Sequence, residues 1–266
     1  MVLPRRRRRH VPPRTEPLAH ATHANAVWCA DFKGDFLLGD RSRCYPLTIT
    51  DACCRPLLRC QGLPSTACEW ARPVFESAFR EYGLPEVLRT DNGAPFASAA
   101  VGGLTRLSIW WVKLGVRPER IDPGKPQQNG RHERMHETLK REACQPPSWS
   151  FRRQQLRFDA FRKTYNEERP HEALGQVTPA SVYQPSLRTY PGRIAPLEYP
   201  DADQTCWVRP NGCIRWRGGE VYVGQVLAAE PVGVVQVADA EWQVVFGPVV
   251  LGTFAPGATG LRRPRR

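Results

Sequence analysis

The sequence predicts an α/β fold in which a mixed sheet is flanked by helices and followed by a small all-β module. Three apolar segments within residues 26–63 are separated by polar turns, a pattern typical of an antiparallel meander. Between residues 65 and 170, segments with helical spacing alternate with short apolar strands, which indicates a sheet with helical layers. After residue 190, alternating strands joined by Asn-Gly and Gly-Gly turns predict a β module of about 50 residues.

The meander is expected to consist of strands within residues 26–38, 43–54 and 55–63. A helix is expected next, because residues 71–79 carry apolar side chains at helical spacing. Ser65 or Thr66 is expected to cap its start and Gly83 its end, while Pro73 is expected to confine the regular part to the residues that follow.

The remaining elements of the sheet alternate between strand and helix. We expect a short strand at residues 87–90, an apolar helix at 102–115 and an edge strand broken by prolines at 116–124. A polar loop then leads into a helix at 129–140, and a longer amphipathic helix at 150–170 is stopped by Pro170.

The distribution of charge along the sequence indicates where the domains begin and end. The net charge is +12, but six Arg lie in residues 1–15 and four in residues 262–266, which leaves 28 basic and 26 acidic residues elsewhere. We therefore expect a basic disordered arm, an α/β core domain, a linker, a small β-barrel module and a basic tail, at residues 1–24, 25–190, 191–204, 205–255 and 256–266.

The chain shows no apolar run of membrane-spanning length and no secretion leader. Its nine Cys contain no C-x-x-C pair, which favours reduced thiols in a cytosolic protein over a disulfide framework.

The stretch NGRHERMHETLK, residues 129–140, supports two different kinds of site. His132-Glu133-x-x-His136 matches the H-E-x-x-H motif of zinc metalloproteases, in which two His on one helix face bind zinc beside a Glu base. Alternatively, Glu133 alone is the last carboxylate of a magnesium site. On a helical wheel His132 lies near Met135, while Glu133 points away, and basic residues crowd the helix. These features favour His132 as a helix-packing residue and Glu133 as a metal ligand.

Three carboxylates in separate elements are candidates for a two-metal site, which uses oxygen ligands. Asp31 lies within the first apolar strand, where an acid is costly unless a charge compensates it. Asp91 begins an Asp-Asn-Gly turn at the carboxyl end of a later strand, where open α/β sheets place their chemistry. Each has a simpler reading: Asp31 as a structural residue, Asp91 as a turn residue and Glu133 as a helix-surface acid.

Four segments together resemble the integrase catalytic core of bacterial insertion-sequence transposases. They are VWCADFKG, RTDNGAPF, PGKPQQNGRHERMHETLK and YNEERPHEALGQVTPASVY, in the order in which the family carries them. The resemblance runs from about residue 25 to 190. It implies a ribonuclease-H-like mixed five-stranded sheet flanked by helices, and the C-terminal module resembles the small SH3-like tail of the same subgroup.

The resemblance also implies an activity and its cofactors. Asp31, Asp91 and Glu133 match the family's three acidic metal ligands, which hold two Mg²⁺ or Mn²⁺ ions. The implied reaction is DNA strand cleavage followed by strand transfer, for DNA integration and transposition. The implied partners are element ends and target DNA, with a homo-oligomer assembled on DNA, no membrane, and a cytoplasmic, nucleoid-associated location in a bacterium.

Polar and basic residues near the acids and in the β module are candidates for DNA contact. In the module, IRWRGGEV interleaves Arg with Trp, a pairing suited to phosphate contact and base stacking. The alternatives are a solvated helix face near the acids and a core Trp in the barrel. The candidates are Lys125, Gln127, Gln128, Asn129, Arg131, Lys140, Arg215, Trp216 and Arg217.

Other functions remain open. Complete members of the subgroup carry N-terminal helix-turn-helix domains, and no such segment precedes the Arg run, so a truncated copy is expected. The alternative function is then an inactive DNA-binding remnant or an inhibitor of an intact transposase. A ribonuclease-H-type nuclease, which hydrolyses without joining strands, is the nearer enzymatic rival.

Overall fold

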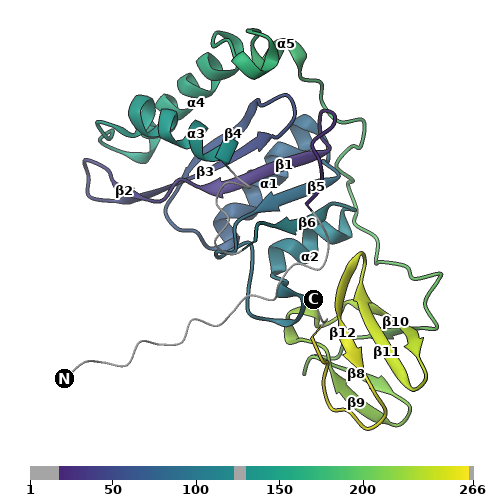
Figure 1. Cartoon of the computed structure of the whole chain (residues 1–266). Helices are drawn as coiled ribbons and strands as arrows, with labels where there is room; N and C mark the ends of the chain where they lie inside the picture. Colours follow the sequence, from purple (N-terminus) through teal and green to yellow (C-terminus); the bar gives the residue numbers. More distant parts are fainter. Residues whose placement is uncertain (1–17, 123–129, 264–266) are drawn as a thin grey trace. The chain divides into compact units, whose positions relative to one another are not determined.

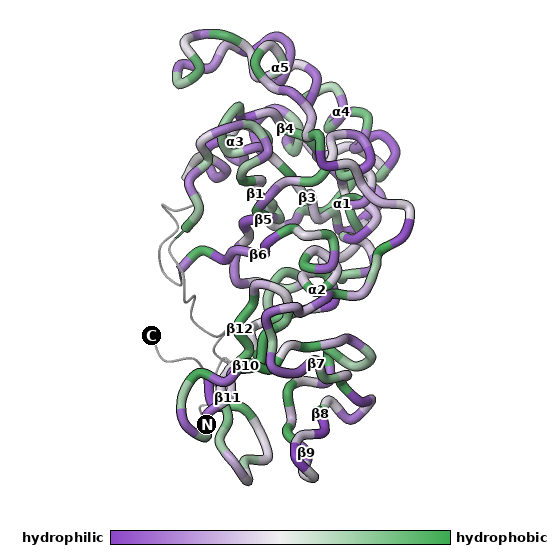
Figure 2. The backbone as a smooth tube through the Cα atoms, turned by 90° about the vertical axis from the view of Figure 1, so that its right-hand side faces the viewer, coloured by the Kyte–Doolittle hydropathy of each residue, from purple (hydrophilic) through white to green (hydrophobic). Residues whose placement is uncertain are grey.

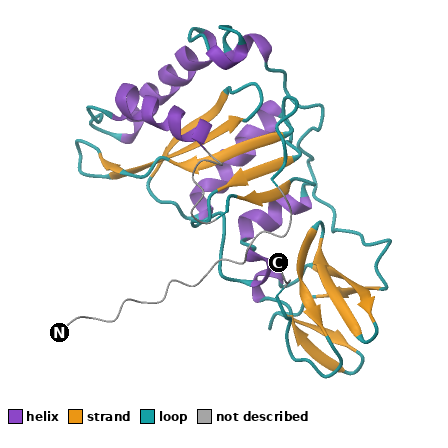
Figure 3. Ribbon diagram, in the orientation of Figure 1, coloured by secondary structure: helices purple, strands orange, loops and turns teal. Residues whose placement is uncertain are grey.

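The computed structural model describes residues 18–122 and 130–263, and these residues fall into two units (Figure 1). The first unit contains the described residues of 16–95 and 114–194, and the second contains 96–113 together with 195–263. The elements of each unit are shown by type in Figure 3.

The first unit is built on a mixed sheet whose centre is the predicted meander. Strands β1 (Val27–Phe32), β3 (Arg43–Asp51) and β4 (Leu57–Leu63) pair antiparallel in the order β1–β3–β4. On the other side of β1, β5 (Val87–Thr90) and the edge strand β6 (Arg117–Arg120) are added in parallel.

The prediction of five strands is confirmed for the main sheet, but it misses one short strand. The two-residue strand β2 (Phe36–Leu37) pairs with the start of β3. The expected single strand over residues 26–38 is divided because Gly34 adopts a φ of 88°, a left-handed conformation that turns the chain out of β1.

Helix α1 (Cys68–Tyr82) covers one face of this sheet. Its apolar stripe, which includes Phe75 and Phe79, packs under β1, where the rings of Trp28 and Phe79 lie 5.9 Å apart. The predicted cap at Ser65 or Thr66 is wrong, because the helix begins after Ala67 without a side-chain cap. Pro73 does not confine the helix either; it lies within it, and Gly83 ends it as expected.

Helices α3 (Gly130–Leu139) and α4 (Phe151–Glu167) cover the opposite face, so that the sheet lies between α1 and α3 (Figure 2). A π-helical turn, Lys140–Cys144, extends α3, and the short helix α5 (Pro179–Val182) follows α4. The core on this face includes Met135, Leu139, Phe158 and Phe161, together with residues of β3 and β4.

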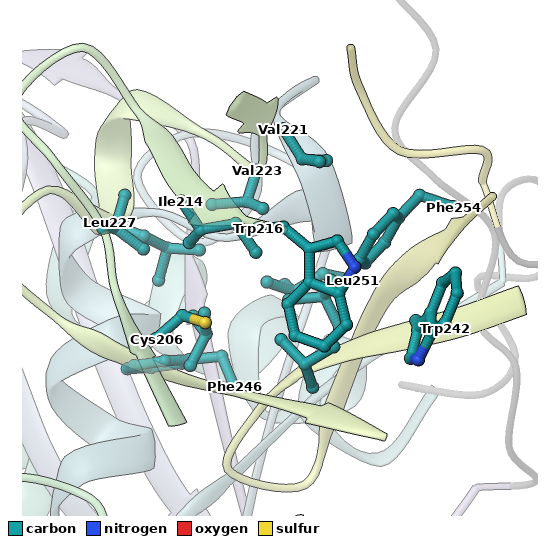
Figure 4. Packing of buried hydrophobic residues seen from close by; sticks show 14 of the residues in the cluster. Cys206, Ile214, Trp216, Val221, Val223, Leu227, Trp242, Phe246, Leu251 and Phe254 are labelled. Carbon is teal, nitrogen blue, oxygen red and sulfur yellow. The ribbon is translucent and has the colours of Figure 1, made fainter. Parts of the chain in front are cut away.

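The second unit is the C-terminal β module with a short helical segment of the central chain. Strands β10 (Pro231–Ala238), β11 (Glu241–Phe246) and β12 (Val249–Phe254) form an antiparallel sheet with β7 (Gln204–Trp207), while β8 (Cys213–Trp216) and β9 (Gly219–Tyr222) form a hairpin. Figure 4 shows that Trp216, Trp242 and Phe254 meet in its core.

Helix α2 (Arg106–Lys113) and the 3-10 turn Val101–Gly103 belong to this second unit. Ile109 and Val112 of α2 are part of the same hydrophobic core as the strands of the module. The helix itself was predicted, but its packing partner was not, because the apolar face of a helix does not indicate which part of the protein it packs against.

No helix among the described residues has the length and apolar character needed to cross a membrane. None of the nine Cys, all of which lie in the described part of the chain, forms a disulfide bond.

Two residues of α4 provide a test of this packing. Phe158 is fully buried against the sheet, whereas Leu156 is 63% exposed because it lies on the opposite side of the helix. We expect Phe158→Ala to lower the free energy of unfolding by about 3–5 kcal/mol, and Leu156→Ala to change it by less than about 0.5 kcal/mol. Urea denaturation of both variants measures this, and similar losses would contradict the packing.

Candidate active site

The register of the central strands brings Asp31 and Asp91 to neighbouring positions at one edge of the sheet. Strands β1 and β5 run parallel, with Ala30 paired to Thr90. Asp31 follows Ala30 in β1, and Asp91 directly follows the last residue of β5. The two acids therefore lie side by side at the carboxyl ends of adjacent strands. Asp91 also accepts a hydrogen bond from the Gly93 N–H at 3.1 Å, which holds the turn that follows β5.

Helix α3 carries Glu133 within electrostatic range of Asp31. Glu133 lies in the first turn of the helix and is exposed, while His132, Met135 and His136 are buried against the sheet. The expected division of the helix is therefore confirmed, with His132 as a packing residue and Glu133 directed to solvent.

Burial raises the pKa of both aspartates, and repulsion from neighbouring acids adds to the rise at Asp31. The pKa of Asp31 is raised to about 7, first by burial and then by the negative charges of Asp91 and Glu133. Burial also raises the pKa of Asp91. Asp31 therefore lies within electrostatic range of both other acids, in a site that accumulates more negative charge than its surroundings neutralise.

These three carboxyls suit a divalent cation by their chemistry. Hard cations such as Mg²⁺ prefer carboxylate oxygens, and a cation would offset both the burial of the Asp31 charge and the repulsion from Asp91 and Glu133 that together raise the pKa of Asp31. Within the described ranges, however, no three His, Cys, Asp or Glu side chains are close enough to form a ready ligand group. The assignment of Asp31, Asp91 and Glu133 as metal ligands stays a prediction.

The H-E-x-x-H alternative does not fit the geometry of α3. In a zinc site both His would direct a ring nitrogen at the ion. Here the Nε2 atoms of His132 and His136 lie 2.7 and 2.6 Å from Thr48 Oγ1, so the hydroxyl fills the place that an ion would need. Burial lowers the pKa of His132 to about 3 and that of His136 to about 2, so both rings are neutral.

The DNA-contact candidates are only partly within the described chain. Lys125, Gln127, Gln128 and Asn129 lie outside the described residues, as does the side chain of Arg131. Lys140 is exposed on the helical turn after α3. Whether any of them contacts DNA stays a prediction.

In the β module, Arg215 and Arg217 are exposed on either side of Trp216. The guanidinium of Arg217 lies 4.6 Å from the ring centre of Trp242. Trp216 itself is 9% exposed and packs in the core with Trp242 and Phe254, which favours the alternative reading of a core Trp over base stacking (Figure 4).

Sequence reasoning missed Thr48 and Thr50, the two residues that contact the histidines. Both are buried, and both lie on the face of β3 that α3 covers. The signal was present in PLTITDA, where two hydroxyls alternate with apolar residues in a buried strand, since a buried polar group requires a partner.

A cavity of about 730 Å³ adjoins α3 on the side of β3 and the end of α4. Its lining includes Arg55, Arg89, Arg134 and Arg169. Arg89 is paired with Glu119 at 2.6 Å and Arg169 with Glu142 at 2.6 Å, so part of this positive charge is already compensated.

The raised pKa of Asp31 leads to a test of the site without metal. The folded protein binds this proton more tightly than the unfolded chain, whose pKa is near 3.8, so ionisation of Asp31 opposes folding as pH rises from about 4 to 7. In the absence of divalent ions we expect Asp31→Asn to exceed the wild type in free energy of unfolding by on the order of 4 kcal/mol at pH 8, and by much less at pH 5. Urea titrations at both pH values measure the difference; equal stabilities at pH 8 would show that burial and the neighbouring acids do not raise the pKa of Asp31.

Comparison with known proteins adds an independent result. The integrase core domain family matches residues 21–126 and, through a second description of the same domain, residues 114–179. Together the matched segments cover more than half of the chain and contain Asp31, Asp91 and Glu133.

Two curated relatives come from bacterial insertion elements. An uncharacterized 31.7 kDa protein of insertion element IS407 from Burkholderia multivorans is 32% identical over 179 residues, which is 66% of this chain and 61% of the relative. An uncharacterized 39.2 kDa protein of insertion element IS476 from Xanthomonas euvesicatoria is 29% identical over 178 residues, 66% of this chain and 49% of the relative. The chain thus spans about half to three fifths of the length of these relatives.

Among solved structures, a chain of the simian T-cell lymphotropic virus intasome in complex with PP2A regulatory subunit B56 gamma is similar in fold. The TM-score is 0.53 at 17% identity, over 93% of this chain and 85% of the other. The ribonuclease-H-like fold predicted from the sequence is therefore confirmed. Residues 21–179, with the two aspartates on adjacent strands and the glutamate on α3, make this chain a member of the integrase core domain family.

Proposed function

We propose that this protein is a transposase of the integrase class that cleaves DNA strands and joins the resulting ends to target DNA. The observation that carries the proposal is the pairing of β1 with β5, which sets Asp31 beside Asp91 at the carboxyl ends of adjacent strands, within electrostatic range of Glu133 on α3. The raised pKa of Asp31 supports it, because clustered carboxylates of this kind are characteristic of functional sites.

The three acids have distinct parts in the proposed site. Asp31 and Asp91 are fixed by the sheet, and they would hold Mg²⁺ or Mn²⁺, two ions per site, with Glu133 completing the set. Bound cations would supply activation of the attacking oxygen and neutralisation of charge on the phosphate. The protein then has to position the DNA ends and exclude other acceptors, which rigid strands do more accurately than loops.

The proposed partners are the two ends of an insertion element and the target DNA. A homo-oligomer assembled on DNA is part of this proposal, because two ends have to be held together while each is cleaved and joined. Phosphate contacts are proposed for the polar residues around the acids and for the exposed arginines of the β module.

The first test of the function removes each acid while keeping its size. Asp31→Asn, Asp91→Asn and Glu133→Gln are each expected to reduce cleavage and strand transfer on oligonucleotides carrying the element end by at least about 10³-fold, because each loses a charge that the metals require. DNA affinity, measured by fluorescence anisotropy, is expected to change by less than about threefold.

The products of this assay distinguish the alternatives. Joined strands from the wild type support a transposase, whereas hydrolysed ends that are never joined would indicate a ribonuclease-H-type nuclease. A wild type that binds DNA but neither cuts nor joins it would indicate an inactive DNA-binding protein.

A second test concerns the β module. We expect the double variant Arg215→Ala, Arg217→Ala to weaken DNA binding and to reduce the slope of log K against log salt by about 1–2, since each phosphate contact releases counterions. The matched control is Arg152→Ala, Arg153→Ala on the exposed side of α4, which removes the same charge. Equal losses in the two doubles would show that net charge, and not the module, governs binding.

A further inference from the structure

The histidine pair of α3 has no role in the proposed chemistry, yet it lies beside the catalytic acids. His132 and His136 are 3% and 5% exposed, and their rings contact edge to face at a centroid distance of 4.6 Å. They flank Glu133 in the sequence, and His136 Nδ1 lies 3.8 Å from Asp31 Oδ2. The pair therefore connects the helix that carries one acid to the strand that carries another.

Thr48 is the point at which these connections meet. It is the direct cross-strand partner of Asp31 in the β1–β3 pairing, so their side chains share one face of the sheet. Its Oγ1 lies 3.1 Å from the carbonyl oxygen of Asp31, 2.7 Å from His132 Nε2 and 2.6 Å from His136 Nε2. Thr48 is fully buried, so these are the partners on which its hydroxyl depends.

The number of protons available fixes the direction of each hydrogen bond. A hydroxyl donates once and accepts twice, and a carbonyl oxygen only accepts. If Thr48 donates to Asp31, both histidines have to donate to Thr48 through Nε2–H. His132 Nδ1 is then an acceptor, and it meets Thr50 Oγ1 at 3.0 Å, which donates to it. This assignment makes all four contacts hydrogen bonds.

The same assignment leaves His136 Nδ1 without a proton where it faces Asp31. An Nδ1–H would donate to the carboxylate of Asp31 and occupy a lone pair that a cation requires. With the proton held on Nε2, the histidine supports α3 without taking up a carboxylate oxygen of Asp31.

We propose that Thr48, His132 and His136 are positioning residues: the Thr48 hydroxyl holds both histidines in the Nε2–H form, which pins α3 to the sheet and keeps Asp31 available to a divalent cation. This inference rests on the proposed function for the role of Asp31. The histidines are not metal ligands in it, and they act through Asp31 and through the placement of Glu133.

The tautomers are read directly by long-range ¹H–¹⁵N NMR of the full chain labelled with ¹⁵N-histidine, without metal or DNA. We expect His132 and His136 each to show a protonated Nε2 and an unprotonated Nδ1 at neutral pH. A proton on Nδ1 of either ring overturns the proposal, and this measurement needs no variant in the site.

The functional consequence is measured by calorimetric titration of Mn²⁺ into the full chain. Thr48→Val keeps the shape of the side chain but removes the hydroxyl, and it frees His136 to carry its proton on Nδ1. We expect the Mn²⁺ affinity to fall by about 10–100-fold, as is usual when a group that orients a ligand is lost. Thr48→Ser, the matched variant that keeps the hydroxyl, is expected to restore the affinity to within about threefold of the wild type.

Two further variants separate failure of this inference from failure of the proposed function. If Asp31→Asn abolishes Mn²⁺ binding while folded Thr48→Val binds as the wild type does, the function stands and the positioning role is wrong. If the wild type binds no Mn²⁺, the proposed function is wrong, and the NMR result still decides the tautomers.

Thr50→Val, which removes only the contact to His132 Nδ1, is expected to lower the Mn²⁺ affinity less than Thr48→Val does. An equal or larger loss would contradict the central place of Thr48.

Discussion

The pairing of β1 with its two neighbours is the constraint on which the site depends. On one side, the parallel register with β5 sets Asp31 next to Asp91, and on the other, the antiparallel register with β3 sets it opposite Thr48. A shift of one residue in either pairing would turn an acid or a hydroxyl to the other face of the sheet. The buried residues of β1, with Trp28 against α1, hold this register because slippage would expose them.

The site also depends on the way in which α3 packs on the sheet, through polar contacts to Thr48 and Thr50 of β3. Most of the contact between the helix layer and the sheet is apolar, but below Glu133 it consists of two histidines and two threonines that satisfy one another. Buried polar groups of this kind are expensive if any partner is lost, and they specify one orientation of the helix where apolar packing would tolerate several. That specificity suits a helix whose exposed side carries Glu133, the proposed third metal ligand.

In the β module, the aromatic residues that stabilise the fold lie in the core, and the charged residues that are candidates for DNA contact lie at the surface. Trp216, Trp242 and Phe254 form an aromatic core, while Arg215 and Arg217 flank Trp216 at the surface. Arg217 rests against the Trp242 ring, which restricts its side chain and keeps its charge at the surface. A rigidly held arginine loses less conformational entropy on meeting a phosphate than a free one, so the core contributes indirectly to any DNA contact.

The sequence by itself determined most of the element order, including the strand at Val87–Thr90 and the edge strand with its prolines, because these depend on local periodicity and turn residues. It put forward Asp31, Asp91 and Glu133 through the resemblance of their motifs to the integrase core, and their role as metal ligands stays a prediction. It also separated His132 from Glu133 by helical angle. Only the tertiary structure decided that β5 pairs with β1, that α2 packs in the unit of the β module, and that Thr48 joins both histidines to Asp31. The contact between Thr48 and His136 alone joins residues 88 positions apart, and no local pattern in a single chain specifies the partner of a buried polar group.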